Sequence, residues 1–318
     1  MRDLAIFVFG VLAVTTTGCK KKGTDGGGGG GWFVGESGLM VNVDPDESPD
    51  DFSDYTLGTD QALEAIACRH RAEAWVAGAG GTLLYTNDGG QAWTTQTLPT
   101  GADLLSVATQ DGGSVFLVGD GVFMTAVPDA NGTATWTLLD GGRLLGVAAS
   151  QGAGTKTVLA IDEDGGVWSY ADGALAMRGQ VAGATAIAVA PDGQLAIAAG
   201  RGLSKSTDGG VTWMALDVDP SIVFEDVRFD RRGDAVAVGS SGAVARIDAD
   251  GRVLLQRVGT ADLKTLHVAP TDDYTGIGYA AGIGGQVWIT YDSGWTWDAG
   301  PTVGGTVLGV DEIGEGHR

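Results

Sequence analysis

Residues 206–213 read STDGGVTW, and the chain repeats this pattern twice. Residues 86–93 read TNDGGQAW, and residues 290–297 read TYDSGWTW. The copies begin 120 and 84 residues apart, which is three periods of about 40 residues followed by two of about 42. A fixed period of this size is typical of solenoids, propellers and arrays.

Each copy has the chemistry of a tight hairpin turn. The Asp carboxylate can accept hydrogen bonds from backbone N–H groups that the turn leaves free, and the glycines can adopt positive φ. The final Trp can bury roughly 150–250 Å² against a neighbouring sheet. The pattern Ser/Thr-x-Asp-x-Gly-x-x-Trp resembles the Asp-box, or BNR, repeat, whose box is a structural turn. Its structural positions are Thr86, Asp88, Gly90, Trp93, Ser206, Asp208, Gly210, Trp213, Thr290, Asp292, Gly294 and Trp297.

Seven Gly-centred hairpins share the period of the boxes. They lie around residues 35–38, 78–81, 119–121, 162–165, 200–202, 239–242 and 282–285. Six of them follow a short apolar segment that reads as a further strand, at residues 63–68, 104–108, 144–148, 186–190, 226–229 and 265–268. These predict six complete units of four strands.

The seventh unit is divided between the two ends of the chain. The hairpin that begins at Trp32 has no preceding strand, and residues 306–310 resemble a first strand that no hairpin follows. Pairing them would close a ring and leave no open sheet edge. We therefore predict an all-β, seven-bladed β-propeller of four-stranded blades, with six or eight blades as alternatives. In the split unit we expect residues 55–57 to form the outer strand.

The composition agrees with many short strands. The 318 residues include 55 Gly and only 8 Pro, and 43% are hydrophobic, which is too apolar for a disordered chain. The formal net charge of −21 argues against nucleic acid as a partner, because nucleic acid is itself negative.

The N-terminus has the pattern of an export signal. Residues 4–14 form an apolar segment too short to cross a bilayer of about 30 Å, and Thr-Thr-Gly-Cys follows at residues 16–19. This resembles a bacterial lipoprotein signal in which Cys19 is acylated; an ordinary secretory signal with a chance cysteine is the alternative. Lys20 in the next position favours the outer membrane, facing either the periplasm or the medium. The expected division is a signal peptide at 1–18, a Lys/Gly-rich tether at 19–31 and the propeller at 32–318.

The remaining residues show no catalytic or metal pattern. Cys68 has no second cysteine to pair with once Cys19 carries lipid, so we expect a buried, inert thiol. His70, His267 and His317 lack metal-ligand spacing, and no Gly-x-Ser-x-Gly elbow occurs. The acidic loop at residues 44–51 lacks EF-hand spacing. We expect no cofactor, no metal and no enzymatic activity.

The alternative from another class is a carbohydrate-binding protein or a sialidase-like glycosidase. Sialidases share Asp boxes on a propeller, but they need an arginine triad, a Tyr nucleophile and a supporting Glu. The Arg-Ile-Pro phrase typical of that family is missing from this sequence.

The wider resemblance covers residues 32–309. VAGAGG at residues 76–81, running into the box at 86–93, is similar to the repeat of the photosystem II stability/assembly-factor propellers. That resemblance implies a non-enzymatic chaperone that holds a membrane-protein intermediate.

From these observations we expect a membrane-anchored, non-catalytic propeller that binds a protein as an assembly or surface scaffold. Propellers usually bind ligands at the mouth where the inner strands begin. The candidate contact residues there are Asp103, Arg143, Glu225 and Lys264.

Overall fold

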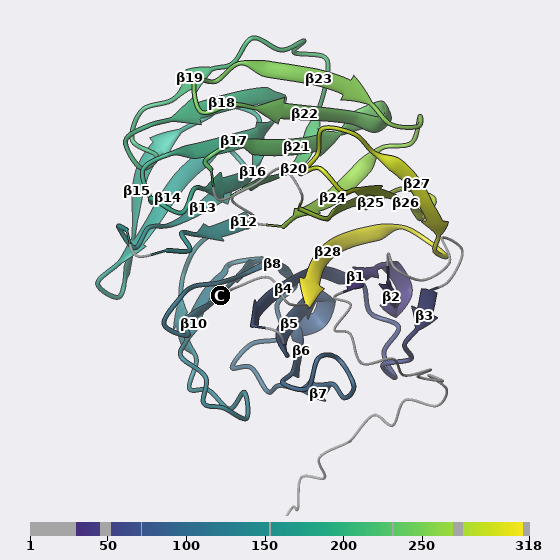
Figure 1. Cartoon of the computed structure of the whole chain (residues 1–318). Coiled ribbons are helices and arrows are strands. Elements are labelled where there is room, and N and C mark those ends of the chain that lie inside the picture. Colours follow the sequence, from purple (N-terminus) through teal and green to yellow (C-terminus); the bar gives the residue numbers. More distant parts are fainter. Residues whose placement is uncertain are drawn as a thin grey trace, which may run out of the picture.

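The computed structural model of the chain describes residues 30–44, 52–70, 72–152, 154–230, 232–269 and 276–313. It contains seven antiparallel sheets of four strands each. The first strand of each sheet contacts the first strand of the next, so the seven sheets form a ring around a central axis (Figure 1). The predicted seven-bladed propeller is confirmed.

Each blade contributes one strand to each of four concentric layers. The inner strands are β4 (Leu63–His70), β8 (Leu104–Thr109), β12 (Leu144–Ala149), β16 (Ala184–Val189), β20 (Phe224–Phe229), β24 (Leu263–Val268) and β28 (Val307–Ile313). The second strands are β1 (Gly30–Gly35), β5 (Glu73–Gly78), β9 (Val115–Gly119), β13 (Val158–Asp162), β17 (Ala196–Gly200), β21 (Ala235–Gly239) and β25 (Gly278–Gly282). The third strands are β2 (Met40–Val43), β6 (Thr82–Thr86), β10 (Val122–Ala126), β14 (Gly166–Ala171), β18 (Gly202–Ser206), β22 (Ala243–Ile247) and β26 (Gln286–Thr290). The outer strands are β3 (Phe52–Asp54), β7 (Thr94–Thr95), β11 (Thr137–Leu139), β15 (Ala174–Gln180), β19 (Met214–Ala215), β23 (Val253–Arg257) and β27 (Asp298–Thr302).

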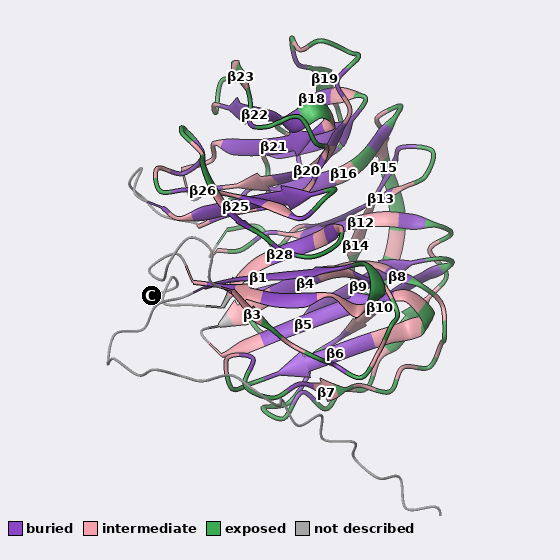
Figure 2. Ribbon diagram, turned by 90° about the vertical axis from the view of Figure 1, so that its right-hand side faces the viewer, coloured by how far each residue is buried: buried purple, intermediate pink, exposed green. Residues whose placement is uncertain are grey.

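The core lies between neighbouring blades. The second strands β9, β17, β21 and β25 are buried along their whole length, because the blades on both sides cover their two faces. Such strands read as continuous apolar runs rather than as alternating ones. Figure 2 shows buried strands such as β5, β21 and β25 in purple, with exposed segments concentrated at the turns and the rim.

The C-terminal strand completes the blade that the N-terminal hairpin begins. β28 pairs with β1 in antiparallel register, and Val310 lies opposite Phe33. Figure 1 shows yellow β28 beside purple β1. Val307 and Val310 are buried, so the closing strand adds apolar core as well as backbone hydrogen bonds. The predicted closure is confirmed.

The outer strand of this blade differs from the prediction. The paired strand is β3, where Ser53 lies opposite Asn42, and it ends before residues 55–57. Tyr55 instead packs against Trp32 with the rings tilted by 51° and 4.6 Å between their centroids, and Leu57 is buried in the same cluster. These residues are apolar because they cover the face of the blade, not because they extend its edge.

β1 begins at Gly30, two residues before Trp32. Cys19, the signal sequence and most of the acidic loop lie outside the described residues. Within the described ranges there is no helix of the length and hydropathy that a bilayer crossing requires.

The Asp-box turns form the hydrogen bonds that the sequence predicts. In the first copy, Thr86 Oγ1 donates to Asp88 Oδ1 at 2.8 Å and accepts the N–H of Gly90 at 3.0 Å. Asp88 Oδ1 also accepts the N–H of Ala92 at 3.0 Å. The same contacts recur at Ser206, Asp208, Gly210 and Thr212, and at Thr290, Asp292, Gly294 and Thr296.

Each box glycine also packs against the preceding blade. Gly90 has φ of 82°, and a Cβ there would lie 2.3 Å from the Trp32 ring. Glycine is therefore required both for the turn and for the close approach of that ring. Trp93 is fully buried, whereas Trp213 and Trp297 are half-buried, with Nε1 bonded to their own turns. The boxes join neighbouring blades.

Candidate functional site in the central channel

The channel is lined by equivalent positions of the seven inner strands. The fifth residues of these strands, here called the fifth-residue ring, are Ala67, Ala108, Ala148, Ala188, Arg228, His267 and Asp311. All seven line one cavity of about 480 Å³. The ring is divided, because four consecutive blades supply alanine and the next three supply charged side chains.

A second ring lies nearer the start of the strands. It consists of the second residues of the inner strands, Glu64, Leu105, Leu145, Thr185, Glu225, Lys264 and Leu308, which line a smaller cavity of about 120 Å³. Arg228 lines both cavities, so it lies between the two ends of the channel.

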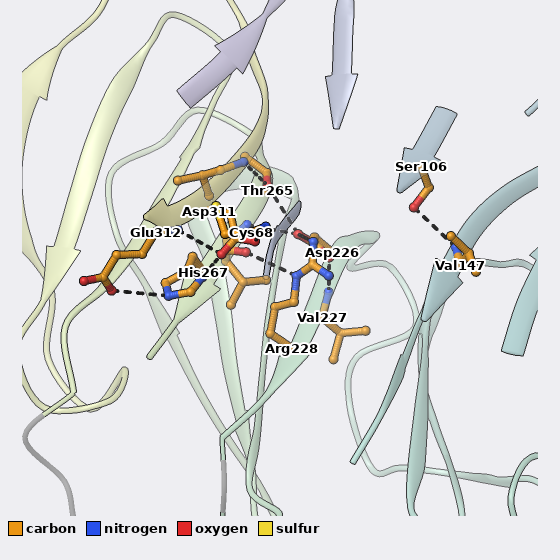
Figure 3. Close-up of polar contacts among 12 residues, drawn as sticks. Cys68, Ser106, Val147, Asp226, Val227, Arg228, Thr265, His267, Asp311 and Glu312 are labelled. Carbon is orange, nitrogen blue, oxygen red and sulfur yellow. Dashed lines mark hydrogen bonds and ion pairs between the residues drawn. The ribbon is translucent and has the colours of Figure 1, made fainter. Parts of the chain in front are cut away.

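Asp311 connects three blades within the charged part of the ring. Its Oδ2 accepts the backbone N–H of Cys68 on β4 at 2.8 Å, and its Oδ1 lies 2.7 Å from Nδ1 of His267 on β24 (Figure 3). Burial alone would raise the pKa of Asp311, but the His267 charge and these hydrogen bonds outweigh burial and lower it. Asp311 is therefore a carboxylate that holds the closing strand to both neighbours.

His267 is the cation of this group. Burial would lower its pKa, but the charges and hydrogen bonds of Asp311 and Glu312 outweigh burial and raise the pKa to about 9. Its Nε2 lies 3.5 Å from a carboxylate oxygen of Glu312. At neutral pH the imidazole is thus protonated and matched by two carboxylates.

Asp226 and Arg228 lie on β20, beside this group (Figure 3). Burial raises the pKa of Asp226, although Arg228 and several hydrogen bonds oppose that shift. Asp226 accepts hydrogen bonds from Val227 N at 2.8 Å, Leu266 N at 3.1 Å and Thr265 Oγ1 at 3.3 Å. It ties β20 to β24 in the way that Asp311 ties β24 to β4.

Cys68 is a free thiol at the edge of the same cavity. Burial, together with the charge of Asp311, raises its pKa well above the usual value. The thiol is therefore protonated at neutral pH and is a poor nucleophile. Cys68 is half-buried, whereas we expected a buried thiol, and its inertness stays a prediction.

The four predicted contact residues are only partly brought together. Glu225 and Lys264 form an ion pair of 2.7 Å across neighbouring blades and belong to the second-residue ring. Arg143, directly before β12, pairs at 3.2 Å with Asp120 in the turn between β9 and β10, and Asp103 accepts the N–H of Gly80 at 2.7 Å. No observation assigns a ligand to any of them, so their role stays a prediction.

Sequence reasoning missed the fifth-residue ring. Its signal is present only after the seven inner strands are aligned, when one column contains four alanines and then Arg, His and Asp.

Among the described lining residues the cavity has two arginines, Arg69 and Arg228, and no tyrosine. Arg69 is bound to Glu73 at 2.7 Å. The described groups of His, Cys, Asp and Glu include no cluster that could hold a metal ion.

The fold and its turns define the class of protein: a seven-bladed β-propeller with Asp-box turns. The model of the family Photosynthesis system II assembly factor YCF48 matches residues 16–127. A structure of YCF48 bound to D1 peptide superposes with a TM-score of 0.60 and 19% identity, covering 84% of this chain and 86% of that chain. The expected resemblance to the assembly-factor propellers is confirmed.

Two further structures show the same architecture. YCF48 from Cyanidioschyzon merolae has a TM-score of 0.60 and 16% identity over 79% of this chain and 88% of that chain. The WD40 β-propeller domain of Doa1 has a TM-score of 0.62 and 13% identity over 79% and 86%. At these identities the likeness shows the fold. No curated protein sequence matches the chain significantly.

Proposed function

We propose that the chain is a non-catalytic, lipid-anchored propeller that binds a protein partner and acts as an assembly scaffold at the bacterial outer membrane. The observation that carries the binding part is the open cavity of about 480 Å³ at the fifth-residue ring. Its divided lining suits a segment with both apolar and polar groups. The YCF48 structure that contains a D1 peptide supports a protein ligand for a propeller of this kind.

The chemistry of the channel supports a non-catalytic role. The thiol of Cys68 is held protonated, and the carboxylates of Asp311 and Asp226 are committed to backbone and side-chain donors that join blades. These groups hold the ring together, and none is an activated nucleophile.

The anchoring part rests on the sequence. The apolar segment at residues 4–14 and the Thr-Thr-Gly-Cys phrase ending at Cys19 support export and acylation. The ten residues between Cys19 and Gly30 would span about 20 Å on average if they behave as a flexible linker, so the propeller would lie close to its membrane.

The binding part is tested by affinity capture from detergent-solubilised envelopes of the source bacterium. We expect the wild-type chain to retain a discrete membrane or envelope protein. Ala148→Leu, which fills the cavity, should reduce capture at least tenfold, whereas the matched change Ala174→Leu on the exposed strand β15 should not. Retention of glycans in place of proteins would favour the carbohydrate-binding alternative.

The anchoring part is tested separately by fractionating cells that express Cys19→Ser. We expect this variant in the soluble fraction and the wild-type chain in the outer-membrane fraction. Outer-membrane attachment of the variant would contradict lipidation at this residue.

A further inference from the structure

Arg228 has hydrogen-bonding capacity that its described neighbours do not use. A guanidinium carries five N–H donors in a fixed plane. Its contacts are a 3.5 Å hydrogen bond from Nε to the carbonyl of Leu266 and a loose 3.6 Å ion pair with Asp226. The side chain is 43% exposed, and it borders both cavities of the channel.

The charged groups around Arg228 are better satisfied than Arg228 itself. Asp226 accepts three hydrogen bonds at 2.8–3.3 Å from other donors, so Arg228 acts on it through charge and not as its main hydrogen-bond donor. The charge of His267 is matched by Asp311 and Glu312. Arg69, the other arginine of the cavity, is held by two hydrogen bonds to Glu73. Nε2 of His267 lies 3.5 Å from Glu312 without a closer hydrogen bond. Among the described cations that line the cavity, Arg228 is therefore the exposed one with several unused N–H donors.

The wall beyond Arg228 contains a recessed apolar stretch, and Thr109, Asp111 and Gln151 line the cavity beside it. Ala188, Ala148, Ala108 and Ala67 follow around the ring, and larger side chains at these positions would occupy the space that now forms the cavity. Pockets that combine apolar lining with a few directional polar groups orient a ligand by its polar head and hold its apolar body against the apolar part of the wall.

We propose that the fifth-residue ring binds a carboxylate carried on an apolar body. The carboxylate would take the two parallel N–H donors of Arg228, and the body would lie against the alanine wall. Arginine suits this role because its planar fork matches the two oxygens of a carboxylate. The inference goes beyond the proposed function, because a free carboxylic acid would satisfy it as well as the C-terminus of a protein.

The test uses two matched pairs of probes and titration calorimetry on the purified chain. Octanoate is compared with octanamide, and acetyl-Ala-Ala-Leu with a free carboxylate is compared with its C-terminal amide. We expect the acid of at least one pair to bind about ten- to hundredfold tighter than its amide, because one charge-assisted hydrogen bond contributes a difference in affinity of that size. Octanoate alone would identify a free acid as the source, and the peptide acid alone would identify a chain terminus. Equal affinities in both pairs, or no binding, would overturn the proposal.

Two variants tie the preference to the residue. Arg228→Gln should remove the preference for the acid, and Arg252→Gln, which changes an 82% exposed arginine in a turn of the same blade, should keep it. If Arg228→Gln does not fold, Arg228→Lys retains the positive charge beside Asp226 and should still lose most of the preference, because it lacks the fork. Retention of the full preference by the Arg228 variants, or its loss in Arg252→Gln, would overturn the assignment. Protein capture is measured independently, so failure here leaves the proposed function testable.

Discussion

Nδ1 of His267 lies 2.7 Å from Oδ1 of Asp311, and this ion pair joins the last strand of the chain to the blade before it. The other oxygen of Asp311 accepts the N–H of Cys68 on the blade after it. One carboxylate thus secures the closing strand on both sides.

This ion pair predicts a loss of stability at alkaline pH. The pKa of His267 is raised from 6.5 to about 9 in the folded chain, so its stabilising contribution is complete below pH 6.5 and is lost as pH rises through 9. The groups facing it are Asp311, Glu312, Cys68 and Arg228. The pKa of Asp311 is lowered and that of Cys68 is raised well above its usual value, so neither shift opposes the trend in this window. We expect the urea midpoint to fall between pH 6.5 and 9.5 in the wild type and to change much less in His267→Gln; equal slopes would contradict the assignment.

Removal of the closing strand should open the ring. Deletion of residues 307–318 exposes one edge of β1 and removes the buried side chains of Val307 and Val310. We expect the melting temperature to fall by at least about 10 °C, since each buried valine contributes about 2 kcal/mol. Free edges also favour association, so light scattering should detect oligomers. Deletion of residues 314–318 is the control, and a synthetic peptide covering 305–318 should restore the monomer. An unchanged melting temperature would show that the ring does not depend on this strand.

The box tryptophans should differ in their effect on stability. Trp93 is 2% exposed and meets Trp32 edge-to-face at 5.7 Å, whereas Trp213 is half-buried. We expect Trp93→Ala to lower the free energy of unfolding by about 3–5 kcal/mol and Trp213→Ala by about 2 kcal/mol. Urea denaturation measures both, and equal losses would show that burial does not set the difference.

In the third box, the hydroxyl of Thr290 should matter more for stability than the hydroxyl of Thr296. Thr290 is fully buried; its Oγ1 donates to Asp292 and accepts the N–H of Gly294. Thr290→Val leaves both partners without that bond and should cost about 1–3 kcal/mol. Thr296→Val removes an exposed contact to the same carboxylate and should cost under about 1 kcal/mol. Urea unfolding of the two variants gives the comparison, and the opposite order would refute it.

Cys68 should resist alkylation in the folded chain. Burial and the charge of Asp311 raise the pKa of this thiol, so its reactive thiolate is scarce at pH 8. In a Cys19→Ser background, where Cys68 is the remaining cysteine, we expect iodoacetamide to react at less than about a tenth of the rate in urea. Similar rates in the folded and unfolded chain would indicate an exposed, ionised thiol.

The repeat and its turns could be predicted from the amino-acid sequence, which favoured seven blades over six or eight. These features are local, since Thr290, Asp292 and Gly294 complete their hydrogen bonds within five residues of chain. The divided seventh blade was also predictable, because each end of the chain contains the part that the other lacks. The outer edge of this blade, at residues 52–57, could not be predicted, because local propensity does not distinguish a paired strand from a segment whose side chains are buried.

The residues that line the channel could be identified only in the folded ring. Arg228, His267 and Asp311 lie on three different blades, and each reads singly as an ordinary strand residue. Their grouping in the channel depends on the alignment of seven strands around one axis. That alignment places the three charged residues beside one another and the four alanines opposite. Contacts of this kind depend on the register and closure of the whole ring, and no local pattern in the chain encodes them.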